Sequence, residues 1–435
     1  MAETNDGTGI EADTPSRNPA RYGYFICLLI FMSYILVFFH RLCPAVIALD
    51  LQEAFGVGGT LLGVLGSAYF YPYALMQLPA GLLADSWGPR RTVPAFFLVA
   101  AAGSVLMALA PNLGVAVLGR VLVGAGVATV FSCNFRIIAE WFPPKQFAVM
   151  GGMFMLMGGV GALSAGAPLA WASDLVGWRA TLLAVAGLTL IMAALDYAFI
   201  RDRPAGRRHS PAAGRTGCGG RPAIGLREGM KMVLSSRRFW PISLWAFLTI
   251  GIGFALGGLW GGPYLMQVHG LTKAQAGGIL STFAFALIIG SPVMGWLSNR
   301  VGRKPVLVGS SVLLTAGCAT LWAFTDTLPV YGLYGSFFLI FLAAGPTGSV
   351  VATVSKELFP LSIAGTSVGM VNLFPFFGGA LLQVAAGAIV SRAEGVAPIL
   401  PAVAYRGMFL LFLVASLGSL AVTFLLEETL GRRQE

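Results

Sequence analysis

The 435-residue chain is 57% hydrophobic and 11% charged, whereas a soluble domain carries roughly 25% charged residues. Together with a mean hydropathy of +0.79, this composition excludes a soluble globular domain and predicts an integral membrane protein. The net charge of +10 is concentrated in one loop, which argues against a nucleic-acid partner and for a lipid bilayer.

Apolar runs of twenty or more residues follow one another along the chain, and about 20 helical residues cross a ~30 Å hydrocarbon core. Strands of a membrane barrel would instead alternate over ~10 residues, and that pattern does not dominate here. The sequence therefore predicts an all-α membrane protein with 12 transmembrane helices. The predicted spans are residues 22–49, 59–84, 92–110, 114–141, 147–173, 178–200, 239–268, 276–298, 305–325, 328–356, 362–391 and 406–426.

The predicted spans fall into two groups of six, joined by a basic segment. We expect a disordered cytoplasmic tail over residues 1–21, a six-helix bundle over 22–200, a cytoplasmic linker over 201–238, a second six-helix bundle over 239–426 and a cytoplasmic tail over 427–435. The N-terminal residues lack the basic start and the small-residue cleavage site of a signal peptide.

The linker carries ten Lys and Arg residues against two acidic ones. Because cytoplasmic loops of membrane proteins are rich in Lys and Arg, the linker and both termini are predicted to lie in the cytoplasm. Residues 226–234, at the end of the linker, have the pattern of an amphipathic helix lying on the membrane surface. Anionic lipid headgroups are a further contact for this basic segment.

A short charged motif occurs once in each half. Residues 81–91 (GLLADSWGPRR) follow the second span, and the related residues 295–304 (GWLSNRVGRK) follow the eighth. Residues 140–143 (EWFP) and 357–360 (ELFP) repeat at nearly the same separation. Two parallel six-helix repeats around a central cavity are an architecture of membrane transporters.

The charged residues of these motifs are candidates for a cytoplasmic gate, a cluster that closes one end of the cavity and breaks when that end opens. Arg136 and Glu140 lie one helical turn apart, within reach of the loop that carries Asp85. Asn299 replaces the acid in the second half, so its cluster should be weaker. Charges that only set the topology are the alternative. The candidate gate residues are Asp85, Arg90, Arg136, Glu140, Asn299, Lys304 and Glu357.

These motifs resemble the major facilitator superfamily over essentially the whole chain. Residues 81–91 are similar to its loop between helices 2 and 3, residues 120–126 (RVLVGAG) to its helix 4 signature, and residues 158–168 to its helix 5 glycine motif. The resemblance implies two six-helix pseudo-repeats in the major facilitator fold and a secondary transporter of the bacterial inner membrane, working by alternating access; we expect it to function as a monomer. Residues 71–81 and 363–369 also resemble a proteobacterial branch that includes phagosomal amino-acid transporters.

Arg41 is the candidate substrate anchor. Exposing it to lipid would cost about 2.5–3.5 kcal/mol, so it should face a central cavity. Tyr34 and Phe38 lie on the same face of the first span. The fork of guanidinium donors suits a carboxylate. An arginine that reaches outward to solvent, or one paired with Asp50, is the alternative.

Two further sets of residues each share one helix face and are candidate cavity walls. The second span contributes two tyrosines and a glutamine, and the eleventh contributes two amides and a phenylalanine. Helix packing, with the amides bonded between helices, is the alternative interpretation. The candidate substrate-binding residues are Tyr34, Phe38, Arg41, Tyr69, Tyr73, Gln77, Asn372, Phe376 and Gln383.

His40 and Arg120 are the candidates for proton coupling. A histidine titrates near neutral pH, and Arg120 belongs, by resemblance, to a motif linked to proton coupling in some members of the superfamily. A structural histidine and an arginine that reaches solvent are the alternatives. Asp50, Asp174 and Asp196 map near the ends of their spans, so proton symport through a buried carboxylate is not predicted.

The sequence shows no nucleophile–base pair, metal-ligand spacing or nucleotide-binding loop, and its five cysteines and three histidines are scattered. We therefore expect no enzyme activity, no metal and no cofactor. The expected solute is small and polar, an amino acid or another carboxylate. The alternatives are an organophosphate or organic-anion exchanger and a transporter-like membrane sensor. The organophosphate antiporters are similar in Arg41, but spans 7 and 8 lack a matching arginine.

Overall fold

The computed structural model describes residues 19–204, 226–360, 363–394 and 401–431, and helices make up nearly all of them. No strand occurs within these ranges, and ten stretches are long and apolar enough to cross a membrane. The prediction of an all-α membrane fold is confirmed. Most of the predicted N-terminal tail and the middle of the linker lie outside the described residues.

Helices cover every predicted span, often as two segments separated by a bend. Before the linker they are α1 (Pro19–Leu42), α2 (Pro44–Phe55), α3 (Gly59–Ser67), α4 (Phe70–Ser86), α5 (Pro89–Ala108), α6 (Leu113–Val127), α7 (Val130–Trp141), α8 (Pro144–Ser164) and α9 (Ala167–Phe199). From residue 226 onward they are α10 (Leu226–Ser235), α11 (Phe239–Ala255), η2 (Leu256–Trp260), α12 (Gly261–Gln267), α13 (Lys273–Leu280), α14 (Thr282–Val301), α15 (Arg303–Ala323), α16 (Val330–Ala343), η3 (Gly345–Thr347), α17 (Val350–Glu357), α18 (Ala364–Val371), α19 (Leu373–Glu394) and α20 (Pro401–Thr423).

The ten apolar stretches and the twelve predicted spans describe the same helices. The second span bends at Ala68 and Tyr69, between α3 and α4, and is not among the ten stretches. The fifth and sixth spans form one helical run, Lys145–Phe199. The turn predicted between them is a kink at Gly177, where φ is 82°.

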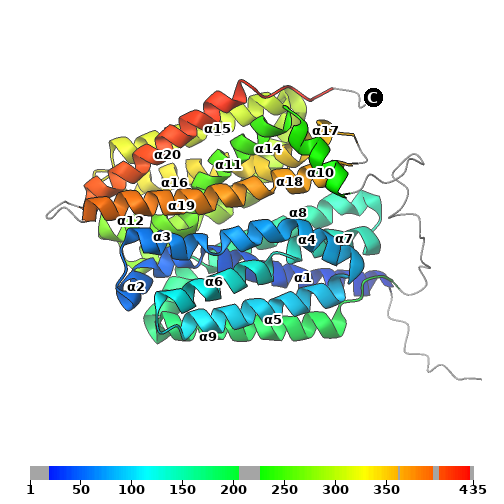
Figure 1. The fold of residues 1–435 in the computed structure, drawn as a ribbon, viewed down its shortest axis with the longest axis horizontal. Coiled ribbons are helices and arrows are strands. Elements are labelled where there is room, and N and C mark those ends of the chain that lie inside the picture. Colours follow the sequence, from blue (N-terminus) through cyan, green and yellow to red (C-terminus); the bar gives the residue numbers. More distant parts are fainter. Residues whose placement is uncertain (1–18, 205–225, 361–362, 395–400, 432–435) are drawn as a thin grey trace, which may run out of the picture.

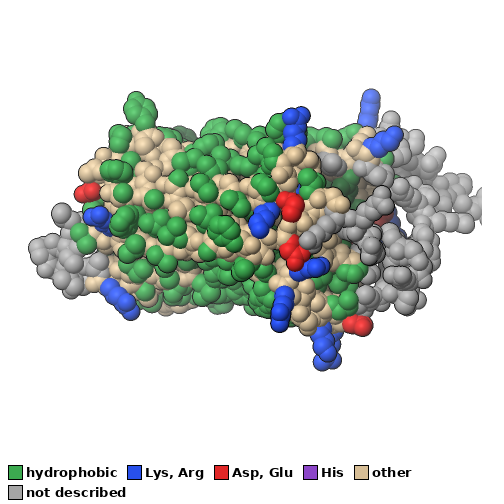
Figure 2. Space-filling view, turned by 90° about the horizontal axis from the view of Figure 1, so that it is seen from above, with side chains coloured by type: hydrophobic (Ala, Val, Ile, Leu, Met, Phe, Trp, Pro, Cys, Tyr) green, Lys and Arg blue, Asp and Glu red, His purple; other side chains and the backbone are tan. Residues whose placement is uncertain are grey.

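Figure 1 shows the helices running along the long axis of the molecule, with α1–α9 below and α11–α20 above. On the outside, α5 packs on α9 in the first half and α15 packs on α20 in the second. Contacts of α3 with α19 and of α8 with α14 join the halves. In Figure 2 hydrophobic side chains form a band across the middle of the face, and charged ones gather toward its ends. We name the end that carries residues 201–204 and α10 the linker end, and the opposite one the far end.

Local signals in the sequence set where several helices begin. Proline stands in the first turn of α5 and of α8, where its missing N–H is not needed. The Asn112 side chain accepts a hydrogen bond from Val115 N (3.1 Å) at the start of α6. Thr272 and Gln275 form a reciprocal capping box at the start of α13.

The charged motif of the first half makes a capped turn at the linker end. Gly88 precedes α5 with φ 78°, a conformation that favours glycine. Asp202, which follows the last helix of the same half, accepts a hydrogen bond from Arg90 N (2.8 Å). A carboxylate is stabilising at a helix N-terminus, where backbone N–H groups lack helical partners.

The second half repeats this turn. Gly302 precedes α15 with φ 106°, and Glu428, beyond the last helix of that half, accepts from Arg303 N (2.9 Å) and Lys304 N (3.0 Å). Partial burial acts to raise the pKa of Glu428, but backbone donors outweigh it and hold this pKa below its ordinary value of 4.5. The donors are the N–H groups of Leu430, Arg303, Lys304 and Thr429.

At the far end an ion cluster joins the two halves. Lys273, the first residue of α13, places its Nζ 2.9 Å from a carboxylate oxygen of Asp50 on α2 and 3.3 Å from one of Asp174 on α9. Thr60 N also donates to Ser391 Oγ across the halves (2.7 Å). These contacts hold the two halves together at the far end. We refer to Lys273, Asp50 and Asp174 as the far-end clamp.

We expect Glu428→Ala to lower the free energy of unfolding by about 1 kcal/mol at neutral pH, a usual effect of losing a helix N-cap. The depressed pKa means that the carboxylate stabilises the fold above pH 4.5 and loses this effect as the pH falls through its folded-state value. Thermal unfolding of the detergent-purified protein measures the loss of stability at neutral pH and its disappearance at acid pH. Glu53→Ala, at an exposed acid of α2, is the control, and a deficit that persists in acid would contradict the prediction.

Lys273→Met should loosen the far end, because it removes the ammonium group that two carboxylates share. The pairs are partly exposed, so the expected loss is about 1 kcal/mol, roughly a fivefold rise in the open population. Hydrogen exchange of residues 45–62 and 261–280 measures it. Lys231→Met, on the exposed side of α10, should leave this exchange unchanged. Equal exchange in wild type and Lys273→Met would show that the clamp does not hold the halves together.

Candidate functional site

Arg41 lies near the end of α1, between aromatic rings from both halves. Its guanidinium carbon is 4.5 Å from the ring centre of Phe38 and 4.8 Å from that of Tyr73. From the second half, Phe254 lies at 5.4 Å and Phe376 at 5.2 Å. These four rings form what we name the aromatic box. Cation–π attraction between the guanidinium and the rings favours this arrangement.

Two nitrogen atoms of the Arg41 guanidinium have no hydrogen-bond acceptor inside the aromatic box. Arg41 is 3% exposed, and its Nε and Nη2 have no partner among the described residues. The hydroxyl of Tyr69, whose ring stacks on Tyr73 (5.6 Å), lies next to the guanidinium of Arg41 and interacts with it, but no hydrogen bond of good geometry forms between them. Buried donors without acceptors cost about 1–3 kcal/mol each. The site therefore presents a positive charge and free donors to an anionic oxygen.

The structure excludes both alternatives for Arg41. Its side chain is buried and does not reach solvent, and Asp50 binds Lys273 of the far-end clamp instead. Phe254 was not among the predicted residues. Only the packing of α11 against α19 brings Phe254 to the box, and its sequence surroundings carry no polar signal.

The other predicted cavity residues divide between the box and its surroundings. Tyr34 stacks on Phe154 (3.8 Å) and contacts Phe38, so it supports the box from inside the first half. Gln77 accepts a hydrogen bond from Asn372 across the halves (3.2 Å).

Gln383 lies beside the box, between helices. Its Nε2 donates to Phe254 O (3.1 Å), and its backbone carbonyl accepts from Trp260 Nε1 (2.9 Å). Its Oε1 is buried without a partner among the described residues. These bonds match the alternative of an amide that joins helices.

His40 and Arg120 lie behind the box, inside the first half. The Nε2 of His40 is 3.2 Å from the hydroxyl of Thr189 on α9, so this side chain points away from Arg41's rings. Arg120 donates from Nη1 to the His40 carbonyl (2.7 Å), and its guanidinium lies 4.9 Å from the ring centre of Tyr69. Arg120 is 1% exposed, so the alternative of an arginine that reaches solvent is excluded; its role in proton coupling stays a prediction.

The predicted gate residues of the first half stay within that half. Arg136 pairs with Asp85, as the motif suggested. Arg90 binds the Tyr197 carbonyl (3.3 Å) rather than Asp85. Glu140 pairs instead with Arg203 of the linker (3.5 Å).

In the second half, Arg303 takes the place predicted for Lys304. It donates to Asn299 Oδ1 (2.6 Å) and pairs with Glu357 (3.2 Å), whereas Lys304 Nζ reaches only the Phe424 carbonyl (3.3 Å). The capped turn causes this difference, because it places residue 303 at the start of α15. No ion pair between the two halves is found at the linker end among the described residues.

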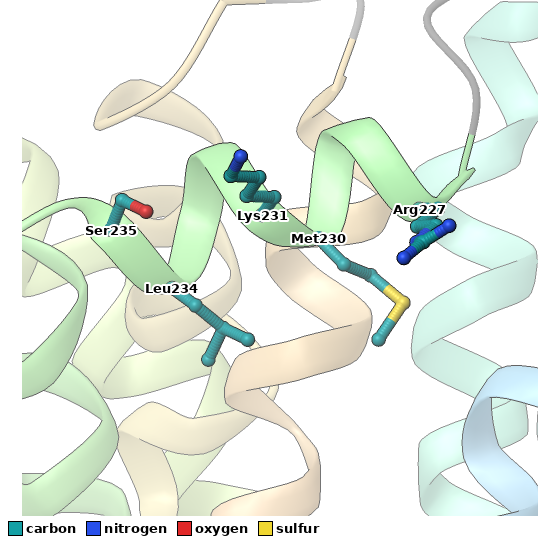
Figure 3. Close-up of a pocket in the computed structure, with 5 residues that line it drawn as sticks. All are labelled: Arg227, Met230, Lys231, Leu234 and Ser235. Carbon is teal, nitrogen blue, oxygen red and sulfur yellow. The ribbon is translucent and has the colours of Figure 1, made fainter.

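A surface hollow lies at the linker end beside α10, away from Arg41. Figure 3 shows its lining of Arg227, Met230, Lys231, Leu234 and Ser235. The buried Gly229 and Val233 lie on the opposite side of this helix, which packs on α18. The amphipathic helix predicted for residues 226–234 is present; its placement on a membrane stays a prediction.

Known proteins resemble this chain over most of its length. Residues 26–280 and 255–435 match the Major Facilitator Superfamily. A probable sulfoacetate transporter of Cupriavidus necator is 24% identical, covering 84% of this chain and 86% of its own. A D-galactonate transporter of Escherichia coli is 24% identical, covering 88% and 92%. A probable galactarate/D-glucarate transporter of Pseudomonas putida is 23% identical, covering 81% and 82%.

The fold has a similar solved structure. A bacterial homolog of the human lysosomal transporter Spinster, in an inward-facing and unoccupied conformation, aligns with a TM-score of 0.77 at 20% identity, over 94% of this chain and 97% of the other. The helix content, the predicted spans, the repeated motifs and the family match all indicate the same family. The chain belongs to the major facilitator superfamily.

Proposed function

We propose that this chain moves a small organic anion bearing a carboxylate across the bacterial inner membrane, with Arg41 as the anchor. The observation that carries the proposal is the buried guanidinium with free donors, enclosed by rings from both halves. A carboxylate accepts two parallel hydrogen bonds from such a fork. Its negative charge also compensates the buried positive one.

The relatives support an organic anion. Their names specify sulfoacetate, D-galactonate and galactarate or D-glucarate, each of which carries a carboxylate. An amino acid would add an ammonium group, and the titratable side chains that act on Arg41 are three tyrosines, with no described Asp or Glu among them. An organophosphate would favour a second arginine. Arg120 instead binds the His40 carbonyl behind Tyr69, so a carboxylate remains the better match.

The arrangement suits alternating access. The halves over residues 22–200 and 239–426 each supply two rings of the box, so a movement between them opens the site. The far-end clamp closes one route. At the linker end, the bond between Gln77 and Asn372 crosses the halves and would break for release there. We place the linker end in the cytoplasm because Lys and Arg concentrate in the linker.

We expect Arg41→Lys to weaken binding of an organic anion roughly tenfold to a hundredfold, because a lysine keeps the charge and loses the fork. Arg41→Ala should abolish binding. Thermal stabilisation of the purified protein by a panel of carboxylates, sugars and cations measures this, since a ligand of the folded state raises apparent stability.

Arg406→Lys is the matched control, because Arg406 is exposed and lies over Trp322 far from the box. It should bind as the wild type does. Stabilisation of Arg41→Ala by a carboxylate to the same extent as the wild type would show that Arg41 is structural. Stabilisation by sugars or cations alone would exclude the organic-anion proposal.

A further inference from the structure

Asp196 is a buried carboxylate that the binding site described above does not use. It lies on α9, three residues before the helix ends, and is 0% exposed. Its Oδ2 accepts a hydrogen bond from Ser33 Oγ on α1 (2.7 Å). Its Oδ1 is buried with no partner among the described residues. The sequence placed Asp196 near the end of its span, and the structure buries it where α9 packs on α1 and α5.

The groups around Asp196 do not neutralise an ionised carboxylate. No described Lys, Arg or His nitrogen forms an ion pair with it. From α1, the Tyr22 hydroxyl binds the Phe199 carbonyl (2.6 Å). From α5, Arg90 binds the Tyr197 carbonyl (3.3 Å).

The remaining titratable groups near this part of α9 are also engaged elsewhere. From α7, Cys133 lies close enough to Asp196 for the two side chains to interact electrostatically. Cys133 interacts in the same way with Arg136, Asp85 and Asp202. Arg136 pairs with Asp85, and Asp202 caps α5. The helices α2 and α13 meet α9 at the far-end clamp, through Asp174. Within the described part of the chain, one neutral hydroxyl is thus the only donor to Asp196, and an ion there is costly.

A second polar contact joins the same two helices. His40 on α1 lies beside Thr189 on α9 (3.2 Å). Ser33 and His40 are seven residues apart, as are Asp196 and Thr189. Seven residues are two helical turns, about 10.5 Å, so both contacts lie on one face of each helix. We name these two contacts the α1–α9 ladder.

The ladder is connected to the aromatic box. The carbonyl of His40 accepts from Arg120, whose guanidinium lies on Tyr69, and Tyr69 stacks on Tyr73 of the box. Moreover, α1 carries the ladder on one face and Arg41, with Phe38, on another. A change in how α1 packs on α9 therefore moves the substrate anchor itself.

We propose that Asp196 is a proton-binding site, and that its protonation favours binding of the organic anion at Arg41. A proton from water adds to Oδ1 and makes a neutral carboxyl, while Ser33 keeps its bond to Oδ2. The neutral form allows the tight α1–α9 packing seen here. Loss of the proton leaves a buried anion that must be hydrated, which separates the helices. This inference rests on the proposed function, and it implies that proton and anion bind together.

The closing experiment measures anion affinity and proton uptake of the purified full-length protein between pH 5 and 9, with D-galactonate and sulfoacetate as probes. For wild type we expect the affinity to rise as the pH falls, by up to tenfold per pH unit, with proton uptake on binding. Asp196→Asn mimics the neutral carboxyl, so it should bind with high affinity that is independent of pH and take up no proton. Glu53→Gln, at an exposed acid, should behave as wild type.

Ser33→Ala is the second variant, should Asp196→Asn fail to fold. The hydroxyl donates to the carboxylate and so favours the ionised form. Its removal should shift the pH dependence of binding to higher pH without abolishing it. An unchanged midpoint, or an Asp196→Asn protein that keeps the wild-type pH dependence and proton uptake, would overturn the proposal.

An infrared measurement separates this inference from the proposed function. A protonated buried carboxyl gives a C=O stretch distinct from that of a carboxylate, and Asp196→Asn should remove one such band from the wild-type spectrum. If neither probe binds the wild type but the band is present and titrates, the substrate assignment fails and the proton site stands. If an anion binds and no band depends on Asp196, the proton site is wrong and the substrate assignment stands.

Discussion

A guanidinium group that loses its water inside a membrane protein must be compensated by what surrounds it. Around Arg41 the faces of four rings supply part of that compensation, and under the proposed function the carboxylate of the solute supplies the rest. The rest of the first half holds Arg41 in this position. On other faces of α1, Ser33 and His40 bind α9, which fixes the rotation of the helix. Helix α1 thus contributes to the box with one face and to the ladder with another.

The bonds between the halves differ in kind from those within each half. Within a half, buried arginines, stacked rings and capped turns hold the helices to one another. Between the halves, the polar contacts are a partly exposed ion cluster and a few single hydrogen bonds. Exposed ion pairs contribute little free energy. Helix packing, such as that of α3 on α19, also joins the halves. A movement between the halves would separate these packed faces and the few polar contacts, while the polar contacts within each half stay intact.

The helices and the grouping of Arg41 with Phe38 were predictable from the sequence, because both depend on local signals. Hydropathy and length locate the spans, and a helix face groups Phe38 with Arg41. Phe254 and Lys273 were not predictable, since Arg41 and Asp50, which they contact, lie more than two hundred residues away in the chain. Asp196 was misjudged for another reason. Distance from a helix end does not determine burial where neighbouring helices extend beyond that end.

The capped turns at Gly88 and Gly302 are each completed by residues of their own half of the chain. Each cap comes from the segment that follows the last helix of its own half, Asp202 in one case and Glu428 in the other. Neither half borrows its cap from the other. A polypeptide cut after residue 204 would leave both fragments with their own terminal acids, so the protein is suited to expression as two separate chains that assemble side by side.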